Sequence, residues 1–286
     1  MKFRAMVMLF ASLLILFYLQ KPSYAEGLFV RGWNSHVTVA ISPEVAVDLG
    51  KGNFSYKFTL NNSRESAQEI QGFIVITDQA CFNLGAPKCW VVSGPKPYRH
   101  PRLPPMVEWY AAGFLEDRDH NRSSPPPSPF NVKPGNSLSD FSFESKSLPG
   151  IVDYCVDGYA RLLTTEEQPE GSFPPGYTYL DDLFKGKTVG PVKVNNMSPS
   201  ELVDRLLILL DESEKVGWLT VPLVKSKLSL QLREIKAHLS DSVKAVKESI
   251  SLLVAEIDTQ RGKAINENGW ALLKSNTEFL YYQIEK

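Results

Sequence analysis

Two hydrophobic periods divide the chain into two parts. Between residues 26 and 192 apolar side chains recur at every second position, most clearly in Phe54–Leu60, where the aromatic and aliphatic side chains share one face. Between residues 193 and 286 they recur at spacings of three and four, which is the period of an amphipathic helix. The pattern therefore predicts a multidomain β + α protein, with a strand-rich domain followed by a helical domain.

The strand-rich part is predicted to form an antiparallel β-sandwich. Glycine, proline and asparagine separate about seven short runs with strand period, which is typical of immunoglobulin-like architecture. The paired cysteines and intervening tryptophan of true immunoglobulin domains do not map onto this sequence. The predicted strands are Val37–Ile41, Phe54–Leu60, Ile70–Thr77, Trp90–Val92, Val107–Ala111, Leu138–Phe143 and Ile151–Ala160.

The helical part is predicted to be an antiparallel four-helix-type bundle. Its first helix begins at a capping box, Ser198–Glu201, in which proline occupies the first helical position. That helix is expected to end near Gly217, and the next begins after Pro222. Two further helices are expected before Gly262 and from about Asn268. Short connections make neighbouring helices antiparallel, and the segment from about Gly186 to Met197 is interpreted as the linker.

Short motifs in the helical part carry a resemblance to a known family. They are Gly217–Leu219, Leu228 with Ala237, Gln260–Lys263, and Ala271–Leu273 with Asn276. On these motifs the segment 193–286 resembles the FIMAH domain, a helical module at the C-termini of secreted bacterial proteins. The pentapeptide that names the family is replaced here by Leu252–Glu256. The resemblance implies an extracellular accessory domain and brings no catalytic residues; a generic bundle of the same topology is the alternative.

Residues 1–25 have the organisation of a secretory signal peptide. Lys2 and Arg4 precede the apolar run Ala5–Leu19, and Ser23–Ala25 is a small-x-small cleavage site. The apolar run is shorter than the roughly 20 residues of a membrane-spanning helix. We therefore expect cleavage after Ala25, a secreted or periplasmic protein, and no membrane span after cleavage.

The bulk charge of the chain gives no indication of a polyanion partner. The 286-residue chain has a formal net charge of −1, and removal of the basic leader makes the mature chain mildly acidic. Positive and negative side chains alternate over the helical part. No nucleic-acid partner is therefore expected.

Three cysteines occur in a compartment that permits disulfides. Cys81 and Cys89 lie on either side of the turn-forming segment Gly85–Pro87, which favours a loop-closing bridge between them. Cys155 is then left as a buried, inert thiol on the opposite strand face from Tyr154. A bridge from Cys155 to Cys81 or Cys89 remains the alternative, because connectivity does not follow from sequence.

Motifs for cofactors, metals and catalysis are incomplete. Gly186–Thr188 resembles the end of a phosphate-binding loop, but the required glycine five residues earlier is Asp181. Asp117–Asn121 has the alternating oxygen ligands of a calcium loop without its later glycine and glutamate. The histidines are scattered, and no nucleophile elbow is present. We therefore predict no cofactor, no metal and no catalytic residues.

One loop has the composition of a ligand-binding site. Tyr98, Arg99 and Arg102 lie between Trp90 and Trp109 on the flanking strands. Aromatic rings stack on sugars and arginine contacts acidic groups, which would suit an anionic cell-surface polymer. The alternative interpretation is that both tryptophans belong to the core.

Together these features favour a non-enzymatic secreted or periplasmic protein that serves surface association, adhesion or scaffolding. The expected partner is a cell-surface or envelope polymer or another extracellular protein. The alternative is a glycan-directed extracellular hydrolase that uses carboxylates in the sandwich loops. A cluster of carboxyl groups with shifted pKa values in one cleft would favour the hydrolase.

Overall fold

The structure is a computed structural model of the whole chain. It describes residues 35–48, 50–95, 103–112, 127–159, 178–194 and 197–284. The predicted signal peptide and the loop residues Tyr98, Arg99 and Arg102 lie outside these ranges.

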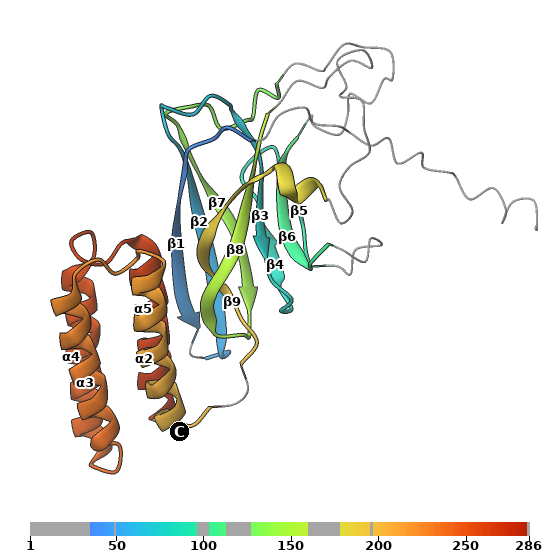
Figure 1. Cartoon of the computed structure of the whole chain (residues 1–286). Coiled ribbons are helices and arrows are strands. Elements are labelled where there is room, and N and C mark those ends of the chain that lie inside the picture. Colours follow the sequence, from blue (N-terminus) through green and yellow to red (C-terminus); the bar gives the residue numbers. More distant parts are fainter. Residues whose placement is uncertain are drawn as a thin grey trace, which may run out of the picture.

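The strands of the described residues form two antiparallel sheets (Figure 1). The four-stranded sheet has the order β1 (Val39–Asp48), β2 (Asn53–Asn62), β7 (Ser137–Ser145), β4 (Phe82–Gly85). The five-stranded sheet has the order β5 (Trp90–Ser93), β6 (Met106–Ala111), β3 (Ile70–Ile76), β8 (Pro149–Gly158), β9 (Phe184–Pro191).

The strand order confirms the prediction of an immunoglobulin-like antiparallel sandwich. The order β1-β2-β7-β4 is that of strands A-B-E-D in an immunoglobulin domain, and β3-β8-β9 is that of strands C-F-G. The additional pair β5–β6 extends the second sheet beyond β3. Greek-key connections therefore link the two sheets without the cysteine bridge of antibody domains.

Two strands were not expected from the sequence, and the clearer case is β9. Its residues from Gly186 onward fall in the segment predicted to be a linker, because Gly186 and Gly190 suggest a loop. In the sheet each glycine lies against a large side chain of β8. A Cβ atom at Gly186 would lie 2.5 Å from the Tyr154 ring, and one at Gly190 would lie 2.6 Å from Val152. The glycines therefore permit close packing within a strand. The other unexpected strand is the short β4.

The space between the sheets is filled by aromatic side chains. Trp109 is fully buried and stacks on Phe73 and Phe143, with ring centroids 5.3 and 6.2 Å apart. Phe58 and Phe141 contact the same indole. On the outer face of the five-stranded sheet, a second buried cluster lies under the 3-10 helix η1 (Tyr179–Asp182); its members are Ile74, Met106, Cys155, Leu180 and Leu183.

The helical part has four helices in the described residues, as predicted. They are α2 (Pro199–Lys215), α3 (Pro222–Ala237), α4 (Val243–Gln260) and α5 (Glu267–Gln283). The capping box forms: the Ser198 Oγ accepts from the Glu201 backbone N–H at 3.3 Å, and the Glu201 carboxylate accepts from the Ser198 N–H at 2.7 Å. Consecutive helices contact each other and α5 closes the ring by contacting α2. None of these helices combines the length and apolar character that a membrane span requires.

The bundle is fixed to the sandwich by α5, which contacts β1, β8 and β9 (Figure 1). Asn268 joins the two sheets: its Nδ2 donates to the Ile41 carbonyl oxygen at 3.0 Å, and its Oδ1 accepts from the Thr188 hydroxyl at 3.0 Å. Two turns further on, the Asn276 amide donates to the Pro149 carbonyl oxygen at 3.1 Å. The buried apolar residues of sandwich and bundle consequently form one continuous core.

Candidate functional site

The two tryptophans of the predicted binding site are core residues. Trp109 is fully buried and Trp90 is nearly so. Their indole N–H groups donate to backbone carbonyl oxygens, that of Phe130 from Trp90 at 3.1 Å and that of Gly85 from Trp109 at 2.8 Å. Neither indole presents an open face on which a sugar ring could stack. Tyr98, Arg99 and Arg102 lie outside the described residues, so their part in binding stays a prediction.

All three cysteines are free thiols in this structure. Cys81 precedes β4 of one sheet, whereas Cys89 precedes β5 of the other, where it adopts a left-handed backbone conformation with φ of 63°. A strand therefore runs between the two cysteines in place of the simple turn suggested by the sequence. The Cys81–Cys89 bridge is not formed here and stays a prediction.

We expect Cys155 to react slowly with thiol reagents. Its side chain is buried, as predicted, in the second buried cluster under η1. Burial raises the pKa of its thiol to about 11. Because the thiolate is the nucleophile, alkylation at neutral pH should be much slower in the native chain than in the denatured chain, and should accelerate as the pH rises. Timed alkylation with peptide mass mapping measures both rates. Equal rates in native and denatured protein would contradict the buried position.

Two carboxyl groups within the described ranges have raised pKa values, and they lie in different parts of the molecule. Burial raises the pKa of Glu108 on β6, although the Tyr179 hydroxyl donates to this carboxyl at 2.8 Å and the Ser93 hydroxyl at 3.3 Å. Burial also raises the pKa of Glu278 on α5. Glu108 ties η1 to the sheet, whereas Glu278 belongs to the bundle. These two groups do not form the single cleft of shifted carboxyls that would favour a hydrolase.

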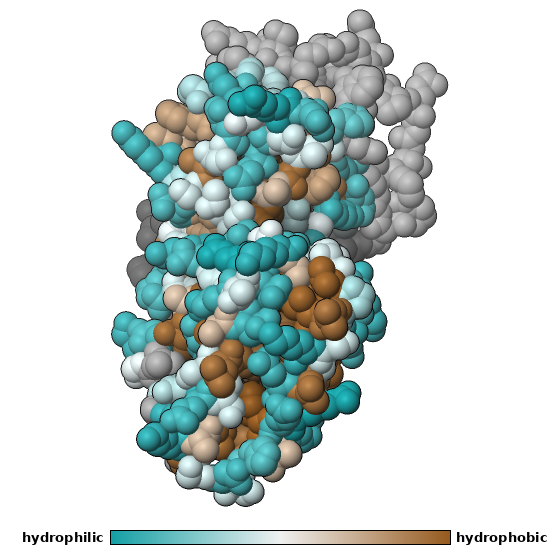
Figure 2. All heavy atoms as spheres, turned by 90° about the vertical axis from the view of Figure 1, so that its left-hand side faces the viewer, coloured by the Kyte–Doolittle hydropathy of each residue, from teal (hydrophilic) through white to brown (hydrophobic). Residues whose placement is uncertain are grey.

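The bundle carries exposed aliphatic side chains on the helices that lie farthest from the sandwich. Leu223 and Leu230 of α3 are 79% and 58% exposed, and Val243 and Leu252 of α4 are 53% and 67% exposed. We call these four side chains the outer face. Figure 2 views the bundle from this side and shows apolar atoms gathered between polar ones. Such gathered exposure on a soluble domain marks a binding surface more often than scattered single residues do.

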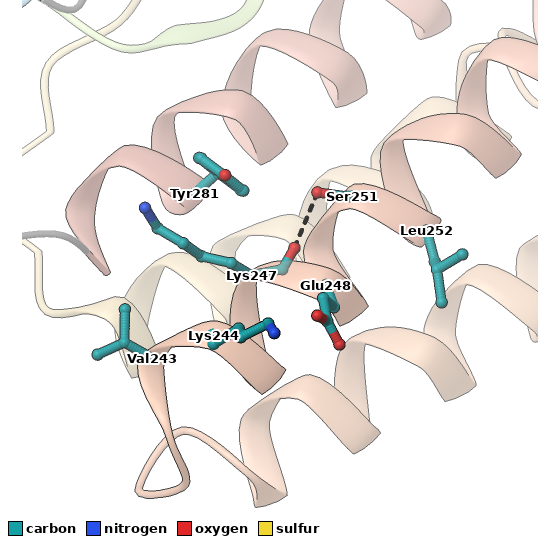
Figure 3. A pocket seen from close by; sticks show the side chains of 7 residues that line it. All are labelled: Val243, Lys244, Lys247, Glu248, Ser251, Leu252 and Tyr281. Carbon is teal, nitrogen blue, oxygen red and sulfur yellow. Dashed lines mark hydrogen bonds between the residues drawn. The ribbon is translucent and has the colours of Figure 1, made fainter.

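A groove of about 860 Å³ adjoins the outer face along α4 (Figure 3). It is lined by Val243, Lys244, Lys247, Glu248, Ser251, Leu252 and Tyr281. Tyr281 comes from α5, and the Lys247 Nζ lies 4.5 Å from the centre of its ring. The Ser251 hydroxyl donates to the Lys247 carbonyl oxygen at 2.9 Å, so its oxygen is held against α4. The lining therefore places two lysines and one carboxylate between Val243 and Leu252, which lie on opposite sides of α4.

Sequence reasoning missed this site. In the sequence Val243 continues the helical apolar period of Val246 and Ile250, although Val243 is exposed in the structure. A signal was present in α3, where Leu223 and Leu230 are seven residues apart and lie off the buried stripe of Leu228, Leu232 and Ile235. Leucines on two faces of one helix indicate a second contact surface.

Comparisons with known proteins add little to this geometry. No protein-family model and no curated protein matches the chain. Among solved structures, the chain is similar to an uncharacterized protein from Nocardia farcinica whose crystal structure reveals an immunoglobulin-like fold. The match has 11% identity and a TM-score of 0.25, and covers 52% of this chain and 95% of that one.

Proposed function

We propose that this protein is a non-enzymatic, secreted or periplasmic binding module that associates with a partner at the cell surface through its helical bundle. The observation that carries this proposal is the outer face, because four large aliphatic side chains of α3 and α4 are each more than half exposed. The sandwich is the support in this proposal, because α5 bonds to both of its sheets and holds the bundle in one orientation.

The setting of the outer face supports a binding role. The strand contacts of the bundle come mainly from α5, so α3 and α4 remain open to a partner. Elsewhere the bundle surface carries exposed ion pairs, such as Lys227 with Glu256 and Lys236 with Asp204. Exposed pairs of this kind contribute little to stability or affinity. The leader and the resemblance to the FIMAH domain are the basis for proposing an extracellular setting.

We expect the double substitution Leu223→Ser/Leu230→Ser to abolish most of the association with cell envelopes. Removing two exposed leucines lowers the apolar area available to a partner, while the stability of the chain should change by less than about 0.5 kcal/mol because both side chains face solvent. Co-sedimentation of the mature chain with purified envelopes of the producing cells measures the association, and thermal unfolding checks the fold.

The matched control is Val91→Ser on β5, since Val91 is 56% exposed but belongs to the sandwich. It should co-sediment like the wild type. Equal retention of all three proteins would refute the bundle as the binding part. Loss of retention in Tyr98→Ala or Arg99→Ala/Arg102→Ala, with the leucine variant unaffected, would instead place the site in the predicted loop.

A further inference from the structure

We infer that Asn268 is a deamidation site whose reaction is blocked while α5 is docked on the sandwich and proceeds when the first turn of α5 opens. The chain contains one Asn–Gly pair, Asn268–Gly269. An asparagine that precedes glycine is the most prone to this reaction, because glycine has no side chain to hinder attack by its backbone nitrogen and adopts many backbone conformations. The site belongs to the junction of bundle and sandwich and is independent of the proposed function.

Two separate packing requirements place this labile pair at the junction. Asn268 supplies a donor to one sheet and an acceptor to the other, which the carboxylate of aspartate cannot do. Gly269 is buried in the first turn of α5. A Cβ atom there would lie 2.9 Å from the Ile265 side chain and 3.0 Å from the Trp218 carbonyl oxygen, so a larger residue would push α5 away. The docking of α5 therefore requires both residues of the pair.

The reaction needs only water and hydroxide as co-reactants. Hydroxide takes the proton from the Gly269 backbone nitrogen, which attacks the side-chain carbonyl carbon Cγ of Asn268. A bond forms between this nitrogen and Cγ, the Cγ–Nδ2 bond breaks, and Nδ2 leaves as ammonia after taking a proton from water, which regenerates hydroxide. Water then opens the five-membered imide at either carbonyl carbon and produces aspartate or isoaspartate at position 268. No group is oxidised or reduced.

The docked structure blocks the first step of this reaction. Ring closure requires the nitrogen and Cγ in contact, so Asn268 has to leave the helical conformation that it adopts in α5. The Gly269 N–H, whose proton must be removed, donates to the N-cap Asn266 Oδ1 at 3.0 Å. Both ends of the Asn268 amide are bonded to the sandwich. The reaction therefore proceeds from the open state only, and its rate falls in proportion to the population of that state.

The product opposes renewed docking. A carboxylate oxygen takes the place of Nδ2, which donates to the Ile41 carbonyl oxygen, so two acceptors face each other. The Thr188 hydroxyl can still donate to the other carboxylate oxygen, and a negative charge in the first turn favours the helix dipole. Neither contact restores a donor for Ile41, and isoaspartate also adds a methylene group to the backbone of α5. Deamidation thus makes a transient opening of the junction permanent.

The first test measures the reaction rate. Peptide mapping by mass spectrometry follows deamidation of Asn268 in the full chain at mildly alkaline pH. The native chain should react at least about 100-fold more slowly than the chain denatured in guanidinium chloride. Leu272→Asp, which places a charge on the side of α5 that faces the strands, should react nearly as fast as the denatured chain. Leu223→Asp adds the same charge at an exposed position and should keep the native rate.

The second test uses Asn268→Asp as the product. Hydrogen exchange should show less protection of β1 and β9 amides in this variant than in the wild type. Asn266→Asp is the matched control, because it makes the same change at an exposed N-cap, where aspartate and asparagine cap equally well. Equal rates of Asn268 deamidation in native and denatured wild type would overturn the block by docking. Wild-type protection in Asn268→Asp would overturn the permanent opening.

Discussion

Replacing Leu272 with Asp is expected to destabilise the sandwich and the bundle together, by more than about 3 kcal/mol. Leu272 is fully buried on α5, between Asn268 and Asn276 at helical spacings of four residues. Because both asparagines donate to carbonyl oxygens of the sandwich, Leu272 lies on the side of α5 that faces the strands. A carboxylate at this position would be buried without a partner.

Hydrogen exchange read by mass spectrometry separates the two parts of the molecule. In the Leu272→Asp variant we expect amides of β1 and β9 to lose protection along with those of the helices. Leu223→Asp is the matched control, since it introduces the same charge at a leucine that is 79% exposed in α3. Unchanged protection of β1 and β9 in the Leu272 variant would show that the sandwich does not depend on α5.

This dependence was not visible in the sequence, because several buried positions of α5 are polar. Asn276, Ser275 and Thr277 are buried on α5, and each uses its side chain to donate to a carbonyl oxygen of the preceding helical turn. In a sequence such residues suggest a solvent-facing side. The periodicity thus predicted a bundle with one buried face, whereas α5 is buried against both the other helices and the strands.

Features that depend on neighbouring residues were predictable. The capping box at Ser198 and Glu201 was expected and forms, because its hydrogen bonds join residues three positions apart. Gly217 ends α2 with φ of 75°, and Gly262 follows α4 with φ of 71°, both in the left-handed region that favours glycine. Strand β9 was missed because the reason for its glycines lies in β8, which is distant in the sequence.

The candidate site was also only partly predictable, because it too depends on residues that are distant in the sequence. A tryptophan in a strand is compatible with a core or a surface position until its neighbours are known, and Trp109 proves to contact Phe58, Phe73, Phe141 and Phe143. The outer face has a clearer signature, since Leu223 and Leu230 share one side of α3, and it is not the side of the core stripe. Whether these two leucines are exposed could be decided only once the packing of α3 against its neighbours was known.

Replacing Trp109 with Ala is expected to cost about 3–5 kcal/mol of stability, since it removes the largest side chain of the sandwich core and leaves a cavity. It also removes the hydrogen bond to the Gly85 carbonyl oxygen, which anchors the end of β4. Denaturant unfolding measures the change. Trp109→Phe should lower the free energy of unfolding by less than Trp109→Ala does, because it keeps an aromatic ring against Phe73. It still removes the N–H donor.

The control is Val91→Ala on the neighbouring strand β5, where the side chain is largely exposed and the expected change is below about 0.5 kcal/mol. The comparison also tests the two interpretations of Trp109 directly. If Trp109 is a core residue, replacing it lowers the stability of the protein whether or not a ligand is present. If Trp109→Ala retained wild-type stability and lost binding to an anionic surface polymer, the indole would have to face a ligand, and its position between the sheets would be refuted.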